Sequence, residues 1–452
     1  MKKIDTDILI LGAGWSGLTA ADRLLQVQKD VIILEKEPQA GGLARTLNYK
    51  GFKFDIGGHR LYFKKEKNIM FVKDLLAQDD LLNLKRKSRI FLDQMYISYP
   101  LIFPSIFKMN KKQLWKIFFE IFQLRKDAEL DNCEAWLKSN YGETLYKIFF
   151  KDYTEKVWGQ SCDRLSSVWS EKRIGRQHLF DFFKDILVQK NGSHKERAHS
   201  FNYPRGGIGA LIKALEYKIA PRCRIYPDVK LGKFRGKINN IDSLVCYVNG
   251  EETEFSFKAL LSTIPLKELL VPFSADHRSS LNDRTSGVQY RSLILVCMAV
   301  HKEIISDWHW CYFPSKDIVF SRIHEPKFWS PDMAPHGQTL LCIEIFCDNK
   351  GGYWEMPDEE IIERVKKSLN VTALLNGKNG FLDACVKRID YAYPLCYKGF
   401  ERPLSEIKGF LSSFKNLYLG GRSGTHSYFD MEECLDNIGQ TVKKMEEDDT
   451  DL

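Results

Sequence analysis

The first 35 residues contain two apolar runs separated by a segment with helical spacing. Residues 8–11 read Ile-Leu-Ile-Leu, and residues 31–34 read Val-Ile-Ile-Leu. Short continuous apolar runs of this kind are typical of strands that are buried on both faces. Between them, residues 18–25 repeat apolar side chains at helical intervals. The pattern predicts a strand, a helix and a second strand.

Three glycines, Gly12, Gly14 and Gly17, occupy the turn between the first strand and the helix. In a dinucleotide-binding turn the first glycine permits the tight bend, the second lets a pyrophosphate approach the backbone, and the third allows close helix–strand packing. The helix N-terminus offers free N–H groups to phosphates. Glu35, directly after the second strand, can accept hydrogen bonds from a ribose diol. These features together predict a dinucleotide-binding unit.

The rest of the chain divides by its periodicity. Residues 66–199 read as mainly helical, and residues 111–122 form an aromatic amphipathic helix that either lies on a membrane or, as we favour, packs into the protein's own core. From about residue 200 strands dominate, with a hairpin turn at Asn249-Gly250 and a buried strand at residues 259–264 that Pro265 ends. Residues 359–369 have the spacing of a helix, residues 414–421 of a last strand and residues 431–445 of a closing helix.

Composition narrows the possible functions. Lys and Arg number 67 against 59 Asp and Glu, for a net charge of +8. A basic surface fits an anionic small molecule, and no nucleic-acid-binding motif accompanies it. Eleven scattered cysteines without a CxxC pair predict reduced thiols in a cytoplasmic protein and no metal site. Neither a signal peptide nor a transmembrane segment is expected, although peripheral membrane contact stays open.

Glycines beyond the acid indicate which dinucleotide binds. Gly41-Gly42-x-x-Arg45 and then Gly57-Gly58-His59 follow Glu35. This order resembles the FAD-binding start of the flavoprotein class that includes amine oxidases, protoporphyrinogen oxidase and UDP-galactopyranose mutase. The resemblance implies FAD as the cofactor, with Gly41, Gly42, Arg45 and Gly58 beside it. A simple surface turn is the alternative for the first glycine pair.

A segment near the C-terminus is more specific. It reads Gly421-Arg422-Ser-Gly-Thr-His-Ser-Tyr428-Phe-Asp430-Met431, which is similar to the Gly-Arg-x-Gly-Thr-x-x-Tyr-x-Asp-Met signature of UDP-galactopyranose mutases. The resemblance implies that Arg422 and Tyr428 hold a substrate diphosphate, while Gly421, Asp430 and Met431 line the flavin. Without the resemblance, Arg422 could be a sheet-edge residue that caps a loop.

Other segments match the same family in order along the chain. The resemblance implies that His59 lies by the isoalloxazine, that Arg173 and Arg322 bind the diphosphate, and that further contacts to the substrate come from Tyr99, Thr154, Trp158 and Tyr393. Simpler roles remain open for three residues: a core position for Trp158, a hydrogen bond from His59 to a backbone carbonyl, and a carboxylate partner for Arg291.

The resemblance also implies a fold. It predicts an α/β protein with a discontinuous Rossmann-type FAD-binding domain (residues 1–65, 200–284 and 386–452). A helical substrate or lid domain (66–199) and a mixed-sheet substrate domain (285–385) complete it.

Two activities stay open. The first is pyranose/furanose ring isomerisation of a nucleotide sugar in cell-surface polysaccharide biosynthesis, through an adduct between the sugar and N5 of reduced FAD, with NAD(P)H as a possible reductant. The second is an FAD-dependent oxidase, dehydrogenase or desaturase reaction. Two departures weaken the mutase resemblance: Leu43 stands where bacterial mutases carry Asn, and Ile102 stands where some carry a Gln near uracil. The sugar, the nucleotide and the oligomeric state are not predicted.

Overall fold

The two apolar runs near the N-terminus form neighbouring parallel strands, as predicted. β1 (Lys2–Leu11) pairs with β2 (Val31–Leu34), and α1 (Trp15–Gln26) connects them. The computed structural model describes residues 1–99, 111–123, 130–174, 200–237, 239–273, 285–375 and 380–449.

Around these strands lies a seven-stranded sheet assembled from distant parts of the chain. Its order is β10-β11-β12-β1-β2-β9, and β18 pairs with β12. β1, β2, β9, β12 and β18 run parallel where they pair, and β10 to β12 form an antiparallel meander. The strands added to β1 and β2 are β9 (Cys223–Tyr226), β10 (Val229–Lys237), β11 (Asn240–Val248), β12 (Glu251–Ser262) and β18 (Leu417–Leu419).

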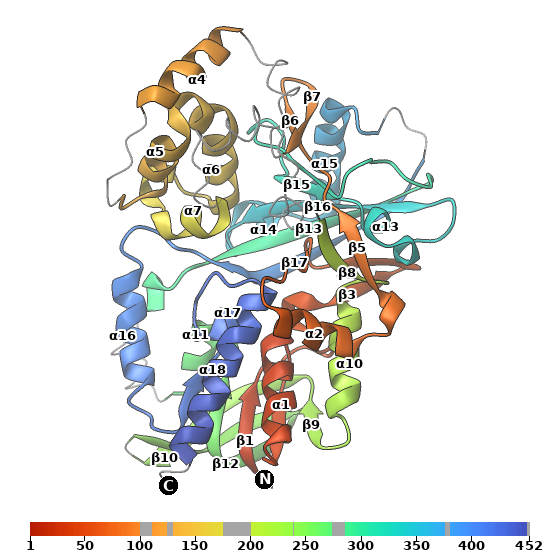
Figure 1. Cartoon of the computed structure of the whole chain (residues 1–452). Helices are drawn as coiled ribbons and strands as arrows, with labels where there is room; N and C mark the ends of the chain where they lie inside the picture. The colour runs from red at the N-terminus through yellow and green to blue at the C-terminus, as the bar shows by residue number, and fades with distance from the viewer. Residues whose placement is uncertain are drawn as a thin grey trace.

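Both faces of this first sheet are covered. Ile8 and Ile10 face a core shared with α1, α10 (Gly209–Ile219) and α18 (Met431–Asp449), whereas Leu9 and Leu11 face a second core. That second core includes side chains of α11 (Leu266–Leu270) and α16 (Glu401–Leu411). The alternation explains why β1 reads as a continuous apolar run. In Figure 1 both chain termini lie at the lower end of this sheet.

A second seven-stranded sheet stands beside the first. Its order is β17-β13-β16-β15-β14-β6-β7, and only the β14–β6 pair is parallel, so the sheet is mixed. One face packs on α15 (Asp358–Thr372). Its strands are β6 (Ser88–Leu92), β7 (Met95–Tyr99), β13 (Tyr290–Val300), β14 (Trp310–Tyr312), β15 (Arg322–His324), β16 (Thr339–Cys347) and β17 (Phe381–Pro394).

Shorter elements join the two sheets. Two antiparallel two-stranded sheets are formed by β3 (Thr46–Tyr49) with β4 (Phe52–Asp55), and by β5 (Leu81–Lys85) with β8 (Ser200–Pro204). The short helices are η1 (Gly42–Ala44), α2 (Glu66–Leu75), η2 (Gln78–Asp80), η4 (Cys162–Arg164), α13 (Pro326–Trp329), η5 (Pro331–Met333), α14 (Gly352–Glu355) and α17 (Gly421–Gly424).

The helices within residues 111–174 form a separate cap, at the upper left of Figure 1. α5 (Cys133–Leu145) begins after Asn132, whose side chain accepts a hydrogen bond from the Ala135 amide (2.8 Å). A π-helical turn, η3 (Tyr146–Lys151), leads into α6 (Asp152–Trp158). The cap also contains α4 (Lys111–Gln123) and α7 (Ser167–Ile174).

Two sequence-based expectations for this region are corrected. The sequence predicted mainly helices over residues 66–199, but the part before residue 100 contains the strands β5, β6 and β7. The β6–β7 turn uses Asp93 and Gln94, both at positive φ (47° and 62°), which a type I′ hairpin requires. Asp-Gln lacks the glycine that usually announces such a turn. In α4 the aromatic side chains of Trp115, Phe118 and Phe119 do not pack into the core but are exposed.

The fold class is therefore the predicted one: a discontinuous Rossmann-type sheet, a helical cap and a mixed sheet. All eleven cysteines are free thiols. Among the residues that the structure describes, no helix has both the length and the apolar character needed to cross a bilayer.

Candidate functional site

The glycine turn after β1 has the geometry that its sequence predicts. Gly12 adopts φ +96°, and a Cβ on Gly17 would lie 1.9 Å from the Gly12 carbonyl oxygen. A side chain at Gly17 would therefore push α1 away from β1. Gly14 is the N-cap residue of α1, and no side chain caps the helix there. The first-turn N–H groups are thus not occupied by a capping side chain, as a phosphate-binding helix N-terminus needs.

The second glycine pair packs against the first turn. Gly41 is buried, and its N–H donates to the Ala13 carbonyl (2.7 Å). A Cβ on Gly14 would meet the Gly42 Cα at 3.8 Å. Arg45 holds this loop in place, because its guanidinium donates to the Gly42 carbonyl (2.9 Å) and to Glu37 (3.0 Å). The simple surface-turn interpretation of Gly41-Gly42 is therefore wrong. The loops form a cradle lined by backbone, which fits the pyrophosphate of a dinucleotide.

Glu35 lies at the end of β2, where the sequence places it. Its carboxylate accepts hydrogen bonds from the Ala13 amide (2.7 Å) and the Glu37 amide (3.0 Å). Both bonds fix the orientation of the side chain beside the glycine turn. A carboxylate has about four acceptor sites, so two bonds leave capacity for a ribose hydroxyl.

The C-terminal motif meets the N-terminal one. The Trp15 indole N–H donates to the Met431 carbonyl (3.1 Å), and a Cβ on Gly421 would lie 2.3 Å from the Ser16 hydroxyl oxygen. Asp430 and Glu433 cap α18 reciprocally, each side chain accepting from the other's amide (2.8 and 2.9 Å). The two ends of the chain thus converge at the N-terminus of α1.

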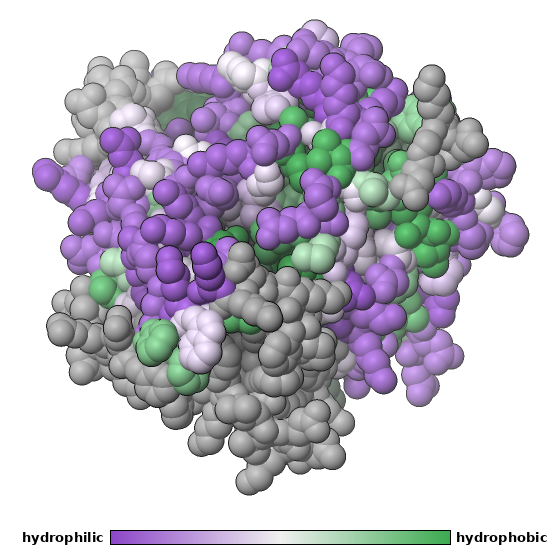
Figure 2. Space-filling view, turned by 90° about the horizontal axis from the view of Figure 1, so that it is seen from above, coloured by the Kyte–Doolittle hydropathy of each residue, from purple (hydrophilic) through white to green (hydrophobic). Residues whose placement is uncertain are grey.

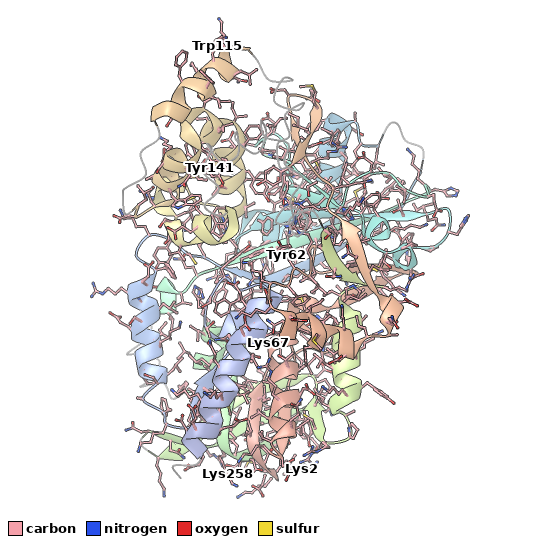
Figure 3. The ribbon with its side chains drawn as sticks, viewed as in Figure 1. Lys2, Tyr62, Lys67, Trp115, Tyr141 and Lys258 are labelled. Atoms are coloured by element: carbon pink, nitrogen blue, oxygen red, sulfur yellow. The ribbon has the colours of Figure 1, made fainter. Side chains whose placement is uncertain are left out.

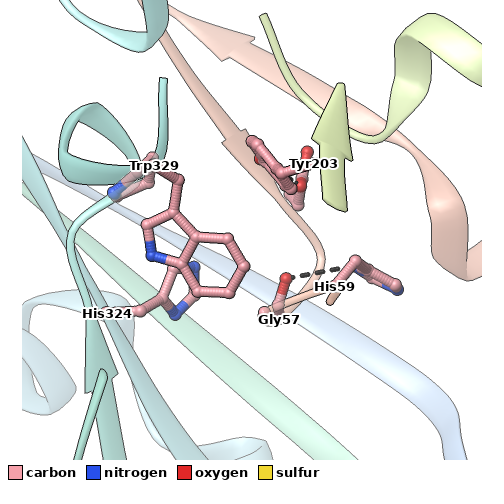
Figure 4. A pocket seen from close by; sticks show the side chains of 8 residues that line it. Gly57, His59, Tyr203, His324 and Trp329 are labelled. Carbon is pink, nitrogen blue, oxygen red and sulfur yellow. Dashed lines mark hydrogen bonds between the residues drawn. The ribbon is translucent and has the colours of Figure 1, made fainter. Parts of the chain in front are cut away.

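A third glycine pair forms the floor of a small pocket (Figure 4). A Cβ on Gly58 would lie 3.2 Å from the Trp310 ring, so only glycine fits there. The His59 Nδ1 atom lies 3.2 Å from the Gly57 carbonyl oxygen, which confirms the backbone hydrogen bond considered for this residue. Burial lowers the pKa of His59 below its usual value. The pocket is completed by Asp55, Tyr203, His324, Pro326 and Trp329.

Four residues predicted to contact the substrate come together from different elements. The Arg422 guanidinium carbon lies 4.5 Å from the centre of the Tyr393 ring and 4.9 Å from that of Tyr428. These two rings stack 5.5 Å apart, and Trp158 meets both edge-on at 6.0 and 6.2 Å. We call Arg422, Tyr393, Tyr428 and Trp158 the arginine–aromatic cluster.

Arg422 has no counter-charge. Within the described part of the chain, its buried Nε and Nη2 atoms have no hydrogen-bond partner, and no carboxylate forms an ion pair with it. The buried indole Nε1 of Trp158 also lacks a partner among these residues. Unsatisfied buried donors are costly. The two unpaired donors of Arg422 therefore indicate an anionic ligand with acceptor oxygens.

Arg322, predicted to act like Arg422, has a different environment. It is buried in β15 and donates from Nε (2.9 Å) and Nη2 (2.5 Å) to one Glu344 oxygen. His324 Nδ1 lies 3.4 Å from the other Glu344 oxygen. Burial alone would raise the pKa of Glu344, but Arg322 and His324 lower it to about 2. The charge of Arg322 is therefore already balanced by a buried carboxylate.

This pair lies beside the Gly57 turn. A Cβ on Gly57 would be 3.8 Å from Glu344 Oε1 and 3.9 Å from Arg322 Nη2. Trp310 contacts two guanidinium groups here, with the Arg60 guanidinium 3.9 Å and that of Arg322 5.6 Å from its ring centre. The floor of the site thus combines two guanidinium groups and an aromatic ring with the carboxylate of Glu344.

The remaining predicted residues have distinct positions. Tyr99, at the end of β7, meets the Tyr312 ring edge-on at 5.5 Å, and Tyr153 meets Tyr312 from another side at 5.4 Å. Thr154 is buried in α6. The Arg173 side chain, as well as Ile102, lies outside the residues that the structure describes.

Arg291 has the carboxylate partner that the sequence left open. Its guanidinium pairs with Asp348 and also donates to the Val157 carbonyl (2.8 Å). It also occupies the space beside Gly159, whose Cβ would lie 2.7 Å from it. Arg291 therefore attaches the end of α6 to the second sheet rather than facing a ligand.

Sequence reasoning missed three residues of the site: Arg60, Trp310 and Glu344. Glu344 had a usable signal, since it is the one acid within the apolar run of β16, and a lone acid in a buried strand needs a partner. Arg60 directly follows the Gly57-Gly58-His59 motif. Trp310 had no signal, because its importance comes only from its place beneath Gly58.

Known proteins with related sequences and folds were compared with the chain. A UDP-galactopyranose mutase from Mycoplasma genitalium is 26% identical over 196 residues, 40% of this chain and 47% of that protein. A carotenoid 3,4-desaturase from Haloarcula japonica is 45% identical over 247 residues, 46% of each chain. The chain thus matches less than half the length of these curated relatives.

Structure gives a longer match. A solved reduced UDP-galactopyranose mutase superposes with a TM-score of 0.80 at 21% identity, over 98% of this chain and 96% of that one. At this identity the likeness shows the fold. The model of the family described as flavin containing amine oxidoreductase matches residues 15–434. The family implies FAD, which fits the backbone cradle described above. The chain belongs to the flavin containing amine oxidoreductase family.

Proposed function

We propose that the protein catalyses pyranose/furanose isomerisation of a nucleoside-diphosphate sugar with reduced FAD. One observation carries this proposal: Arg422, whose buried Nε and Nη2 atoms have no partner among the described residues, lies beside the Tyr393 and Tyr428 rings. A diphosphate supplies the negative charge and the oxygen acceptors that these donors lack. Such a group is both the handle and the leaving group of a nucleotide sugar.

FAD would supply a nucleophilic ring nitrogen in its reduced form, which is why the reaction needs no protein nucleophile. In this proposal the glycine turn and the Gly41-Gly42 loop hold its pyrophosphate, and Glu35 binds its ribose. The isoalloxazine would lie next to His59, where Gly57 keeps the backbone turn free of a side chain.

The chain's own residues would neutralise charge that develops on the departing diphosphate. Arg422 is preorganised for this task because the two tyrosine rings hold its plane before the ligand arrives. The tyrosine hydroxyls and the Trp158 indole can add hydrogen bonds to phosphate oxygens. We assign Arg173, Tyr99 and Thr154 to the same substrate on the strength of the mutase-like sequence alone.

Arg322 needs a qualified assignment. Two of its N–H groups are committed to Glu344, so a phosphate would have to compete with a buried carboxylate. We propose that Arg322 and Glu344 mainly shape the floor beneath the flavin, and that Arg422 supplies most of the uncompensated charge.

The test is a comparison of redox states. Purified protein is incubated anaerobically with UDP-galactose and a panel of other nucleotide sugars, either oxidised or reduced with dithionite, and the products are separated by chromatography. We expect a furanose product from the reduced protein alone. Arg422→Met should abolish most turnover, whereas the surface variant Arg364→Met should match the wild type.

A second candidate is an FAD-dependent oxidoreductase reaction on a small molecule. The Arg322–Glu344 pair favours it, because an arginine whose charge Glu344 already balances suits a less highly charged substrate. The Gly41-Gly42-Leu43-Ala44-Arg45 start also fits this branch. Substrate-dependent bleaching of the oxidised flavin, followed by peroxide release or dye reduction, would support this candidate and contradict the isomerase.

A further inference from the structure

Helix α4 has an inner face that is well anchored. Ile117 is buried with Leu145 and Phe149 of the neighbouring helical segment. Glu120 points toward the same side, where its carboxylate accepts hydrogen bonds from the Thr144 amide (2.9 Å) and hydroxyl (2.7 Å). These contacts fix the rotation of the helix about its axis, and with it the side chains that point outward.

The outward side chains are large aromatics. Trp115, Phe118 and Phe119 are 64%, 49% and 59% exposed. Their rings contact one another at centre distances of 6.1 to 6.2 Å, so they form one apolar surface, the α4 aromatic patch. Trp115 lies at the tip of the helical cap, far from the two sheets (Figure 3). Among the residues that are coloured in the view from that end, most are hydrophilic, with hydrophobic patches between them (Figure 2).

The charged side chains that the structure describes on α4 are two lysines at the surface and one acid, Glu120, which is turned inward. Lys112 and Lys116 are exposed on the same helix as the aromatics. An amphipathic surface helix normally buries its large apolar side chains and exposes its charged ones, whereas α4 exposes aromatic rings and turns its acid inward.

We propose that the α4 aromatic patch docks on the surface of an anionic lipid bilayer. Indole and phenyl rings are stable at the boundary between headgroups and acyl chains, and lysines beside them are attracted to anionic headgroups. A symmetric contact with a second copy fits less well. It would bring Lys112 and Lys116 of both copies together, with Glu120 turned away. The inference does not depend on the reaction that the enzyme catalyses.

Co-sedimentation of the full-length flavoprotein with sucrose-loaded vesicles tests this proposal. One set of vesicles is pure phosphatidylcholine and the other contains about one third phosphatidylglycerol, at low and high salt. We expect binding to the anionic vesicles, weakened by salt. Trp115→Ser/Phe118→Ser/Phe119→Ser should remove it. Lys112→Gln/Lys116→Gln should weaken it by about 30-fold at low salt, since each lysine near an anionic surface contributes roughly fivefold.

A matched control removes exposed aromatics elsewhere. Tyr217 and Tyr247 are 86% and 44% exposed on other elements, and Tyr217→Ser/Tyr247→Ser should bind vesicles like the wild type. Flavin content and melting temperature of every variant establish that it is folded. Failure of the wild type to bind anionic vesicles, or equal binding by the triple serine variant, would overturn the proposal. Self-association that the triple variant loses, without vesicle binding, would also overturn it and identify a second copy as the occupant.

Discussion

Arg322 and Arg422 lie in two regions of one site but have opposite electrostatic environments. Arg322, on the second sheet, is bound to buried Glu344. Arg422, in α17 directly after β18, lies beside two tyrosine rings and has no carboxylate partner among the described residues. A buried ion pair is closed to further ligands unless it breaks, whereas an unpaired guanidinium has its donors available. The comparison separates an arginine that organises the structure from one that is available to a ligand.

The largest expected effect tests the closed pair. Glu344→Gln should destabilise the protein by about 3–5 kcal/mol, because it leaves the buried Arg322 charge without its counter-charge. Chemical denaturation followed by tryptophan fluorescence measures the change. The control is Glu360→Gln, which breaks an exposed pair with Arg364 and should cost less than about 0.5 kcal/mol. Equal effects of the two variants would show that the Arg322–Glu344 pair contributes no more to the free energy of unfolding than an exposed pair does.

Removing both members of the pair should restore stability. In Arg322→Met/Glu344→Met no buried charge remains, so most of the loss seen in Glu344→Gln should be recovered, by about 1–4 kcal/mol. The same denaturation experiment measures it. The double variant also separates the two arginines functionally. If its affinity for UDP stays near that of the wild type, Arg322 is not a phosphate ligand, and a strong loss of affinity would place it beside Arg422.

Arg422→Met is expected to have the reverse profile. Its stability should change by less than about 1 kcal/mol, because no partner loses its counter-charge. Its affinity for UDP should fall by about 10- to 150-fold, the value of a charged hydrogen-bond donor. Isothermal titration with UDP measures this, and Arg422→Lys should retain part of the affinity. Unchanged binding in Arg422→Met would contradict the assignment of the arginine–aromatic cluster to a diphosphate.

The smallest effect is a pH dependence. Glu344 has a pKa lowered from 4.5 to about 2 by its partners, so the unfolded chain binds more protons than the folded one between these values. Stability should therefore fall as the pH decreases through this window, by about 1 kcal/mol at pH 4 relative to pH 7. The difference between wild type and Arg322→Met/Glu344→Met, measured by denaturation at each pH, isolates this contribution. A difference that is constant with pH would show that Glu344 is not held ionised.

The sequence by itself determined mainly the course of the backbone. The strand–glycine–helix start and the Gly41-Gly42 pair indicate their geometry locally, because glycine adopts positive φ without strain and tolerates the approach of another backbone. The strand and helix periods likewise predicted the closing strand and α18. The same reasoning missed the β6–β7 hairpin, whose Asp93-Gln94 turn lacks a glycine.

What only the tertiary structure decided is which charged side chains are paired. In the sequence, Arg322 and Arg422 both lie in segments that resemble the UDP-galactopyranose mutase family, so the sequence gives them the same role. Their difference comes from Glu344, on a strand 22 residues beyond Arg322, and from Tyr393 and Tyr428, which a third strand and a loop bring together. Burial and Coulomb interactions depend on distances in space, and residues far apart in the chain set those distances. The outward rotation of α4 depends in the same way on Thr144 and Ile117, which hold the opposite face.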